Sequence, residues 1–64
     1  MRLGDVYSRK DYEYTIVGKI RHEDDSCYVY TIKQREYGQD EVSYFVHCGD
    51  FTQGYVFINN ELDE

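Results

Sequence analysis

The sequence predicts an all-β fold, or a β-rich α+β fold, built as a small antiparallel meander of four to five strands. Apolar and polar residues alternate with a period of two over most of residues 12–58, the pattern of strands that bury one face. Tyr, Phe, Val and Ile recur along this stretch, and polar clusters interrupt it at short intervals. Because these residues favour sheets and such clusters favour turns, we expect an SH3-like barrel.

Four alternating runs and three connections define the predicted strands. The runs cover residues 12–21, 27–35, 41–48 and 51–58. The connections are the polar clusters at 22–26 and 36–40 and the dipeptide Gly49-Asp50. A glycine followed by an acidic residue is a signal for a two-residue hairpin, so we expect the fourth run to pair with the third.

These turns set a register that collects the large apolar side chains on one face of the sheet. The expected pairs are Arg21–Cys27, Glu13–Arg35, Arg35–Glu41 and Cys48–Phe51. The expected core face then carries Ile16, Ile20, Tyr28, Tyr30, Ile32, Val42, Tyr44, Val46, Phe51, Tyr55 and Phe57. Gly18 falls opposite Tyr30 and Gly54 opposite Phe45, an aromatic-over-glycine arrangement that stabilises strand glycines.

The opposite face of this sheet also carries apolar residues, which must be covered. They are Val17, Val29, Phe45, Val56 and Ile58. One solution is closure into the SH3-like barrel, with Leu3–Tyr7 as a fifth strand. A second is pairing with another copy of the chain, which would make a homodimer. A third is a short N-terminal helix over residues 8–14, because Ser8 and Asp11 have the spacing of a capping box.

Length and charge exclude several classes of protein. A chain of 64 residues forms one small domain, residues 1–58, followed by an acidic, frayed C-terminal tail at residues 59–64. It is too short for a nucleotide-binding α/β layer with a separate substrate pocket. The net charge is −6, and residues 36–64 hold seven of the 13 acidic residues but no Lys or Arg. This half of the chain would repel anionic lipids and nucleic-acid phosphates.

The residues that could carry chemistry do not form a recognisable catalytic or metal site. His47 and Cys48 are neighbours on an expected strand and so point to opposite faces, and the cysteine spacing of structural zinc sites is absent. The glycines are scattered singly, so no phosphate-binding loop is predicted. We therefore expect a protein that is not an enzyme and needs no metal or cofactor.

The predicted location is the cytoplasm, because the sequence shows neither a secretory signal nor an apolar stretch of 18 residues. Two cysteines in a reducing compartment would be thiols. Cys27 and Cys48 fall within one residue of being cross-strand neighbours in the expected register, which leaves a disulfide as the alternative state.

The acidic residues are the candidate binding residues. Alternate turns of a meander lie at the same end of the sheet, so one group would gather Glu23, Asp24, Asp25 and Asp50. The other group would gather Glu36, Asp40, Glu41, Glu61, Asp63 and Glu64. About 25 Å would separate the two groups, given the rise per residue of a strand. Two carboxylate clusters with tyrosines between them would suit a basic protein, such as one that itself binds DNA or RNA.

An SH3-like nucleic-acid-binding domain is the alternative function. Tyrosines could stack on bases, and the basic residues of the first half could form a strip of Arg9, Lys10, Lys19, Arg21 and Lys33. The overall acidity of the chain is far from the basic footprint of such proteins. A protein partner is therefore favoured over direct binding of nucleic acid.

No motif in the chain identifies a family. The opening Gly4-Asp5-Val6-Tyr7, followed by alternating strands, resembles the start of many SH3-like barrels. As a tiny, acidic, proline-free and tyrosine-rich chain, the protein is similar to small phage-encoded proteins that bind and inhibit host factors, some of which mimic DNA. This resemblance implies a non-catalytic inhibitor, and no site residue is carried over from it.

Overall fold

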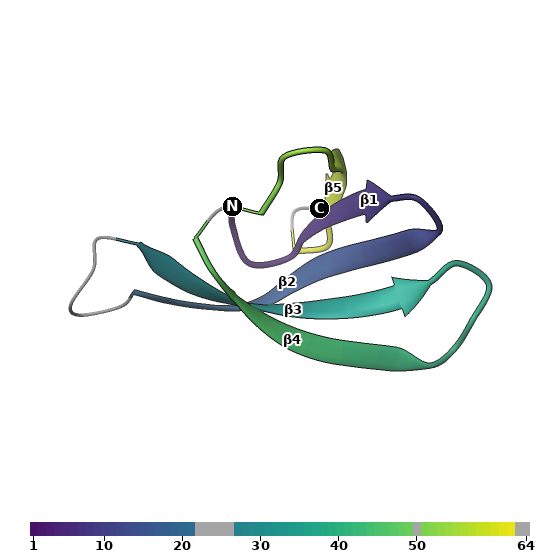
Figure 1. Cartoon of the computed structure of the whole chain (residues 1–64), viewed down its shortest axis with the longest axis horizontal. Helices are drawn as coiled ribbons and strands as arrows, with labels where there is room; N and C mark the ends of the chain where they lie inside the picture. The colour runs from purple at the N-terminus through teal and green to yellow at the C-terminus, as the bar shows by residue number, and fades with distance from the viewer. Residues whose placement is uncertain (22–26, 50, 63–64) are drawn as a thin grey trace.

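The computed structural model describes residues 1–21, 27–49 and 51–62. They form one five-stranded antiparallel sheet with the strand order β4-β3-β2-β1-β5 (Figure 1). The strands are β1 (Asp5–Arg9), β2 (Tyr12–Arg21), β3 (Tyr28–Glu36), β4 (Val42–Cys48) and β5 (Val56–Asn60). The first four form a meander, and β5 returns to pair with β1. The predicted all-β class is confirmed.

The sheet is not closed into a barrel, so this part of the prediction is wrong. β4 and β5 lie at opposite edges of the sheet, and they are not paired with each other over the residues described. The segment that was expected to close the barrel does contribute β1, but β1 lies between β2 and β5. It therefore extends the sheet and does not seal it.

The N-terminal helix that was considered over residues 8–14 is also wrong. These residues belong to a hairpin in which Arg9 lies opposite Tyr12, and Lys10 takes a positive φ of 55° in its turn. No residue in the described ranges is helical. A helix this short is marginal on its own, whereas the hairpin supplies backbone hydrogen bonds along two strands.

Arg35 marks where the predicted register is right and where it is wrong. On one side it lies opposite Glu13, as predicted, and its Nη2 is 3.7 Å from Glu13 Oε1. On the other side it lies opposite Val42, one residue beyond the predicted partner Glu41. Because a slip of one residue exchanges the two faces of a strand, Phe45 packs on the core. The expected core residues Val42, Tyr44 and Val46 are exposed instead.

A bulge in β2 changes the pairing a second time. The register with β3 shifts by one residue between Ile16 and Gly18. Gly18 consequently lies opposite Thr31 and not opposite Tyr30, so the expected aromatic-over-glycine pair is wrong. The same shift turns Ile20 outward, where it is 71% exposed. An extra residue on one strand has this effect because side chains alternate with a period of two.

The fourth predicted strand does not return along the third, as the Gly49-Asp50 signal had indicated. After β4 the chain crosses to the other edge of the sheet, where β5 pairs with β1. Gly54 has a φ of 82° in the connection that precedes β5, so its expected place opposite Phe45 is also wrong. β5 runs to Asn60, two residues into the segment that was predicted to be a tail.

Residues 51–55 cover the side of the sheet that we call the core face. The ring of Phe51 lies edge-on at 6.0 Å from Tyr7 and at 5.2 Å from Tyr55, and Tyr55 lies 5.0 Å from Tyr14. The buried cluster consists of Tyr7, Ile16, Tyr30, Ile32 and Phe51. The path of the chain follows from this burial, because a tight hairpin back along β4 would not carry Phe51 over Tyr7.

A buried carboxylate joins the N-terminal segment to β5. Asn60 Nδ2 donates to Asp5 Oδ1 at 2.7 Å, and the backbone N–H of Arg2 donates to Asp5 Oδ2 at 2.8 Å. Burial, the largest single influence, raises the pKa of Asp5, but these hydrogen bonds and the charges of Arg2 and the N-terminus outweigh it and hold the pKa below 3.8. Beside it, Gly4 has a φ of 87°, and a Cβ there would lie 2.7 Å from Leu62.

Candidate functional site

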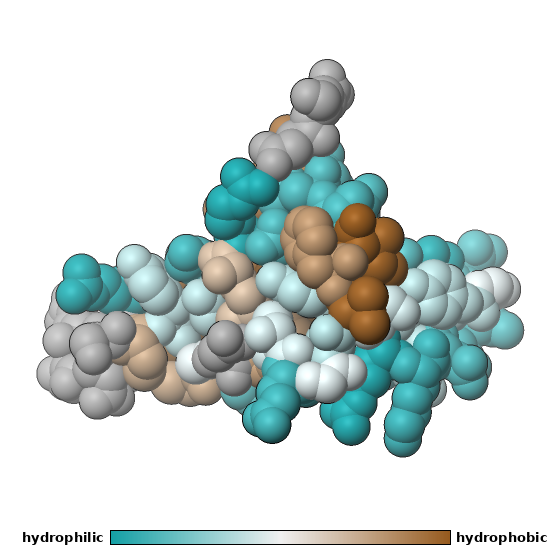
Figure 2. All heavy atoms as spheres, turned by 90° about the horizontal axis from the view of Figure 1, so that it is seen from above, coloured by the Kyte–Doolittle hydropathy of each residue, from teal (hydrophilic) through white to brown (hydrophobic). Residues whose placement is uncertain are grey.

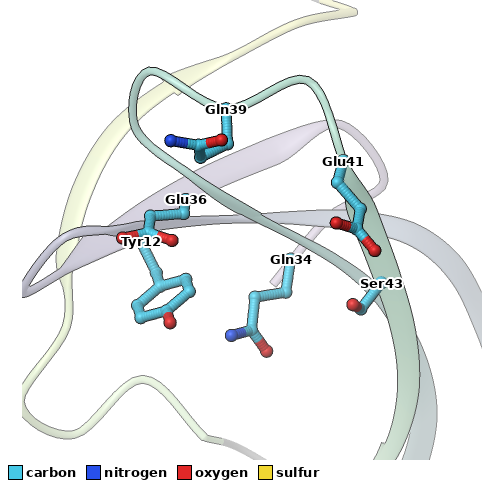
Figure 3. Close-up of a pocket in the computed structure, with 6 residues that line it drawn as sticks. All are labelled: Tyr12, Gln34, Glu36, Gln39, Glu41 and Ser43. Atoms are coloured by element: carbon cyan, nitrogen blue, oxygen red, sulfur yellow. The ribbon is translucent and has the colours of Figure 1, made fainter.

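The end of the sheet at the β3–β4 connection contains a polar hollow of about 320 Å³, which we call the acidic hollow. Its lining residues are Tyr12, Gln34, Glu36, Gln39, Glu41 and Ser43. Figure 3 shows Glu36 and Tyr12 on one flank and Glu41 and Ser43 on the other, with Gln34 between the flanks. Two carboxylates from different segments of the chain therefore border the same space.

The alternation of β2 and β3 places these side chains on the core face. Gln34 and Glu36 follow the buried Ile32 at intervals of two, so they point to the same side of β3. Cross-strand pairing adds Tyr12 opposite Glu36 and Ser43 opposite Gln34. The acidic hollow thus lies on the core face. Its lining includes no residue of the 51–55 segment, which covers the core face elsewhere.

Backbone hydrogen bonds fix the connection that carries Gln39 and Glu41. The N–H of Gln39 donates to the carbonyl of Glu36 at 3.0 Å, and the N–H of Tyr37 donates to the carbonyl of Asp11 at 2.9 Å. Gly38 supplies the positive φ, 83°, that the third position of such a turn requires. Arg35 Nη1 also donates to the carbonyl of Gln39 at 3.2 Å. The rim of the hollow is therefore held by both neighbouring hairpins.

The chemistry of the lining favours a cation with several hydrogen-bond donors. Carboxylates accept only, while hydroxyl and amide groups can both donate and accept. No Lys or Arg is among the lining residues. The nearest cation along the chain, Arg35, lies opposite Glu13, and its guanidinium contacts the Glu13 carboxylate and the backbone carbonyl of Gln39. Small-molecule sites are mostly apolar, whereas this lining is polar and its two carboxylates complement a positively charged group.

The structure brings together only part of the predicted acidic group at this end. Glu36 and Glu41 line the acidic hollow, and the exposed Asp40 lies between them in the connection. Glu61 lies elsewhere, in a separate hollow of about 240 Å³ beside Leu3 and the start of β1. Its position follows from the antiparallel pairing of β5 with β1, which places the C-terminal end of β5 at the start of β1.

The other predicted acidic residues lie outside the described residues. They are Glu23, Asp24, Asp25, Asp50, Asp63 and Glu64. The sequence reasoning also missed the neutral residues of the acidic hollow, Tyr12, Gln34, Gln39 and Ser43. For Tyr12 and Gln34 the signal was their parity with core residues on β2 and β3, and for Ser43 it was parity on β4, which becomes informative only once the register of β4 is known. Gln39 lies in the connection between β3 and β4 and had no such signal.

The predicted second apolar face has a different composition in the structure. Phe45 belongs to the core face, while Ile20 and Val46, expected in the core, are 71% and 65% exposed. On β5, the consecutive residues Val56, Phe57 and Ile58 are all exposed. A compact apolar patch is visible when the molecule is seen from above (Figure 2).

Comparison with known proteins found no match. No protein-family model fits the chain, and neither a curated protein nor a solved structure matches it. Within the described ranges, no three His, Cys, Asp or Glu side chains are grouped so that they could hold a metal ion. The part of the chain that the structure describes contains no helix long and apolar enough to cross a bilayer. The chemistry of the acidic hollow is therefore the basis for a functional proposal.

Proposed function

We propose that this chain is a small, non-catalytic protein-binding module whose acidic hollow takes up a lysine or arginine side chain of a basic partner protein. The observation that carries the proposal is the lining of the hollow, in which Glu36 and Glu41 meet neutral hydrogen-bonding groups and no basic residue. Lys and Arg only donate hydrogen bonds, so they complement the two carboxylates.

The expected affinity of this contact is modest, and it should depend on salt. Glu36 and Glu41 are exposed, and ion pairs between exposed groups are weakened by water and screened by dissolved ions. Asp40 lies beside the hollow, and the net charge of −6 of the chain would attract a basic partner over a longer distance. A docked partner would add contacts around the rim, where Asp40 lies.

The sharper form of the proposal is an inhibitor of the phage type that mimics DNA. Its carboxylates would occupy the positions on the partner protein that normally bind DNA phosphates. This form requires that DNA compete with the protein for its partner. In a mobility-shift experiment, adding the protein should release DNA from such a partner, and release should weaken as salt is raised.

Direct binding of nucleic acid is less well supported by the arrangement of the basic residues. Lys19 is held over the ring of Tyr28, with its Nζ 4.4 Å from the ring centroid, and Lys33 lies on the outer face opposite Tyr44. Lys10 and Arg21 are near opposite ends of β2. The spread of these four residues gives less support to the continuous basic strip that the alternative requires.

One titration tests the proposal against the nucleic-acid alternative. A labelled arginine-rich peptide should bind the protein in low salt, and Glu36→Gln combined with Glu41→Gln should weaken binding about five- to thirtyfold. Glu61→Gln is the matched control, because it removes a carboxylate away from the acidic hollow. Tight binding of single-stranded DNA or RNA by the isolated protein, with no difference between these variants toward the peptide, would favour the alternative.

Self-association through the exposed apolar residues stays a prediction from the sequence. Sedimentation velocity measures it directly. A concentration-dependent dimer would support it, and a monomer at all concentrations would contradict it.

A further inference from the structure

The two cysteines meet at the opposite end of the β3–β4 hairpin from the acidic hollow. Cys27 immediately precedes β3, and Cys48 is the last residue of β4. Both are thiols in the structure, and their Sγ atoms are 3.2 Å apart. This contact is unrelated to the acidic residues on which the proposed function rests.

The pairing of the two strands produces this contact. Val29 lies opposite Cys48, and Cys27 precedes Val29 by two residues, so all three side chains fall on the same side of the hairpin. The N–H of Gly49 donates to the carbonyl of Tyr28 at 2.9 Å, which continues the pairing past the end of β4. The sulfur atoms are therefore held together by the backbone ladder on both sides of Cys48.

The distance and the exposure both suit thiol–disulfide exchange. A disulfide has an S–S length of about 2.05 Å, so the two sulfur atoms need to approach by only about 1.2 Å, within reach of small side-chain rotations. Cys48 is exposed and Cys27 is half-buried. An oxidant in solution can reach Cys48 first, and Cys27 is then in place to resolve the intermediate.

We propose that Cys27 and Cys48 form a redox modification site that is oxidised by a small-molecule disulfide of the glutathione class. The Cys48 thiolate attacks one sulfur of the oxidised glutathione, forms a mixed disulfide and expels one glutathione thiolate. The Cys27 thiolate then attacks the Cys48 sulfur, closes the Cys27–Cys48 bond and expels the second glutathione. The protein loses two electrons and two protons, and the glutathione disulfide gains them as two thiols.

The bond would lock β4, an edge strand of the sheet, onto β3. It would enclose residues 27–48, which include the whole hairpin and the connection that forms the rim of the acidic hollow. A cross-link of this span restricts the unfolded chain, so the oxidised protein should unfold at a higher temperature. Because the bond lies at the far end of the hairpin, binding at the acidic hollow should change little.

Intact mass and thermal unfolding test the site together. After incubation of the full chain with oxidised glutathione, the mass should fall by two hydrogen atoms, and the protein should stay monomeric on a non-reducing gel. The melting temperature should rise by at least about 10 °C and return to its first value after reduction. Cys27→Ser and Cys48→Ser are the matched controls, and each should instead gain one glutathione and show no such rise.

Three results would overturn the proposal. The wild-type chain could carry two glutathiones, which would show that the sulfur atoms do not reach each other. It could form disulfide-linked dimers, which would show that the thiols react between chains. It could also remain fully reduced under conditions in which the single-cysteine variants are glutathionylated.

Discussion

The most informative perturbation of the fold is Phe51→Ala. Phe51 is only 9% exposed and packs edge-on against Tyr7, Tyr55 and, in a tilted arrangement, His47. It anchors residues 51–55, which cover the core face. In a closed barrel the sheet itself would have covered that face. If this cover is what stabilises an open sheet, then removing one ring should affect the whole domain.

The size of the effect follows from the buried area of the ring. A phenylalanine removes roughly 150–200 Å² from water, and at about 25 cal/mol per Å² this amounts to about 4–5 kcal/mol as an upper value. Alanine retains part of that area, so we expect a loss of about 3–4 kcal/mol in the free energy of unfolding. A domain of this length has a total of about 3–10 kcal/mol. The variant should therefore be unfolded if the total lies at the low end of this range, and should lose roughly a third of its stability at the high end.

Urea unfolding followed by circular dichroism measures this loss, and Val46→Ala is the control. Val46 is 65% exposed, so its truncation should cost less than about 0.5 kcal/mol. If Phe51→Ala does not fold, Phe51→Leu replaces it. This variant should stay folded and lose about 1–2 kcal/mol in the free energy of unfolding. Equal losses for Phe51→Ala and Val46→Ala would refute the reasoning, because they would place both side chains in the same environment.

Two further predictions concern the β1–β2 turn and the buried carboxylate. Lys10→Gly should raise the free energy of unfolding by about 0.5–1 kcal/mol, since glycine adopts the φ of 55° without a Cβ penalty. Lys10→Ala is the control and should show no such gain in thermal unfolding. Equal effects of the two substitutions would contradict this prediction. Asp5→Asn should lower the free energy of unfolding by about 1–3 kcal/mol at pH 7. Asn60 and Arg2 donate to different carboxylate oxygens of Asp5, and an amide has only one oxygen in their place. The lowered pKa of Asp5 means that its ionised form stabilises the fold above about pH 3.9, and that this contribution is lost as pH falls through the folded-state pKa. The gap between Asp5→Asn and wild type should therefore narrow below about pH 4 in urea unfolding, and a gap that stays constant from pH 6 to pH 2 would contradict the assignment.

The strands were predictable from the sequence because alternation and turn signals are local. Ile16, Tyr30, Ile32 and Phe51 were all assigned to the core and are buried. Register was harder, because β4 carries large apolar residues on both faces and its alternation fits either orientation. Only the length of the β3–β4 connection decides whether Phe45 or Val46 lies on the core face. This connection has one residue more than expected, which exchanges the two faces of β4.

The long-range pairing of β5 could not be derived from local signals. Gly49-Asp50 has the composition of a tight hairpin, but Phe51 is buried over Tyr7 on the core face. That contact joins residues far apart in sequence, so no short stretch of the sequence reveals that it stabilises the fold. The bulge between Ile16 and Gly18 is similar, since it depends on how β2 bends to pair with both β1 and β3.

The candidate site was predicted in part from charge alone. The absence of Lys and Arg from residues 36–64 pointed to Glu36 and Glu41, which border the same hollow. The neutral residues Gln34 and Gln39 carry no such signal, because their contribution comes from facing the carboxylates in space. Glu61 was expected in the same group, and the pairing of β5 places it elsewhere.

The most direct test of the acidic hollow is a nuclear magnetic resonance titration that observes the side-chain amides of Gln34 and Gln39. An acetylated and amidated arginine-rich peptide should shift both amide signals. The same peptide with citrulline in place of arginine has nearly the same shape without the charge and should leave them unchanged. The shifts should persist in Glu61→Gln and disappear when Glu36→Gln and Glu41→Gln are combined. Equal shifts with both peptides, or shifts that survive the loss of both carboxylates, would contradict a cation-binding hollow.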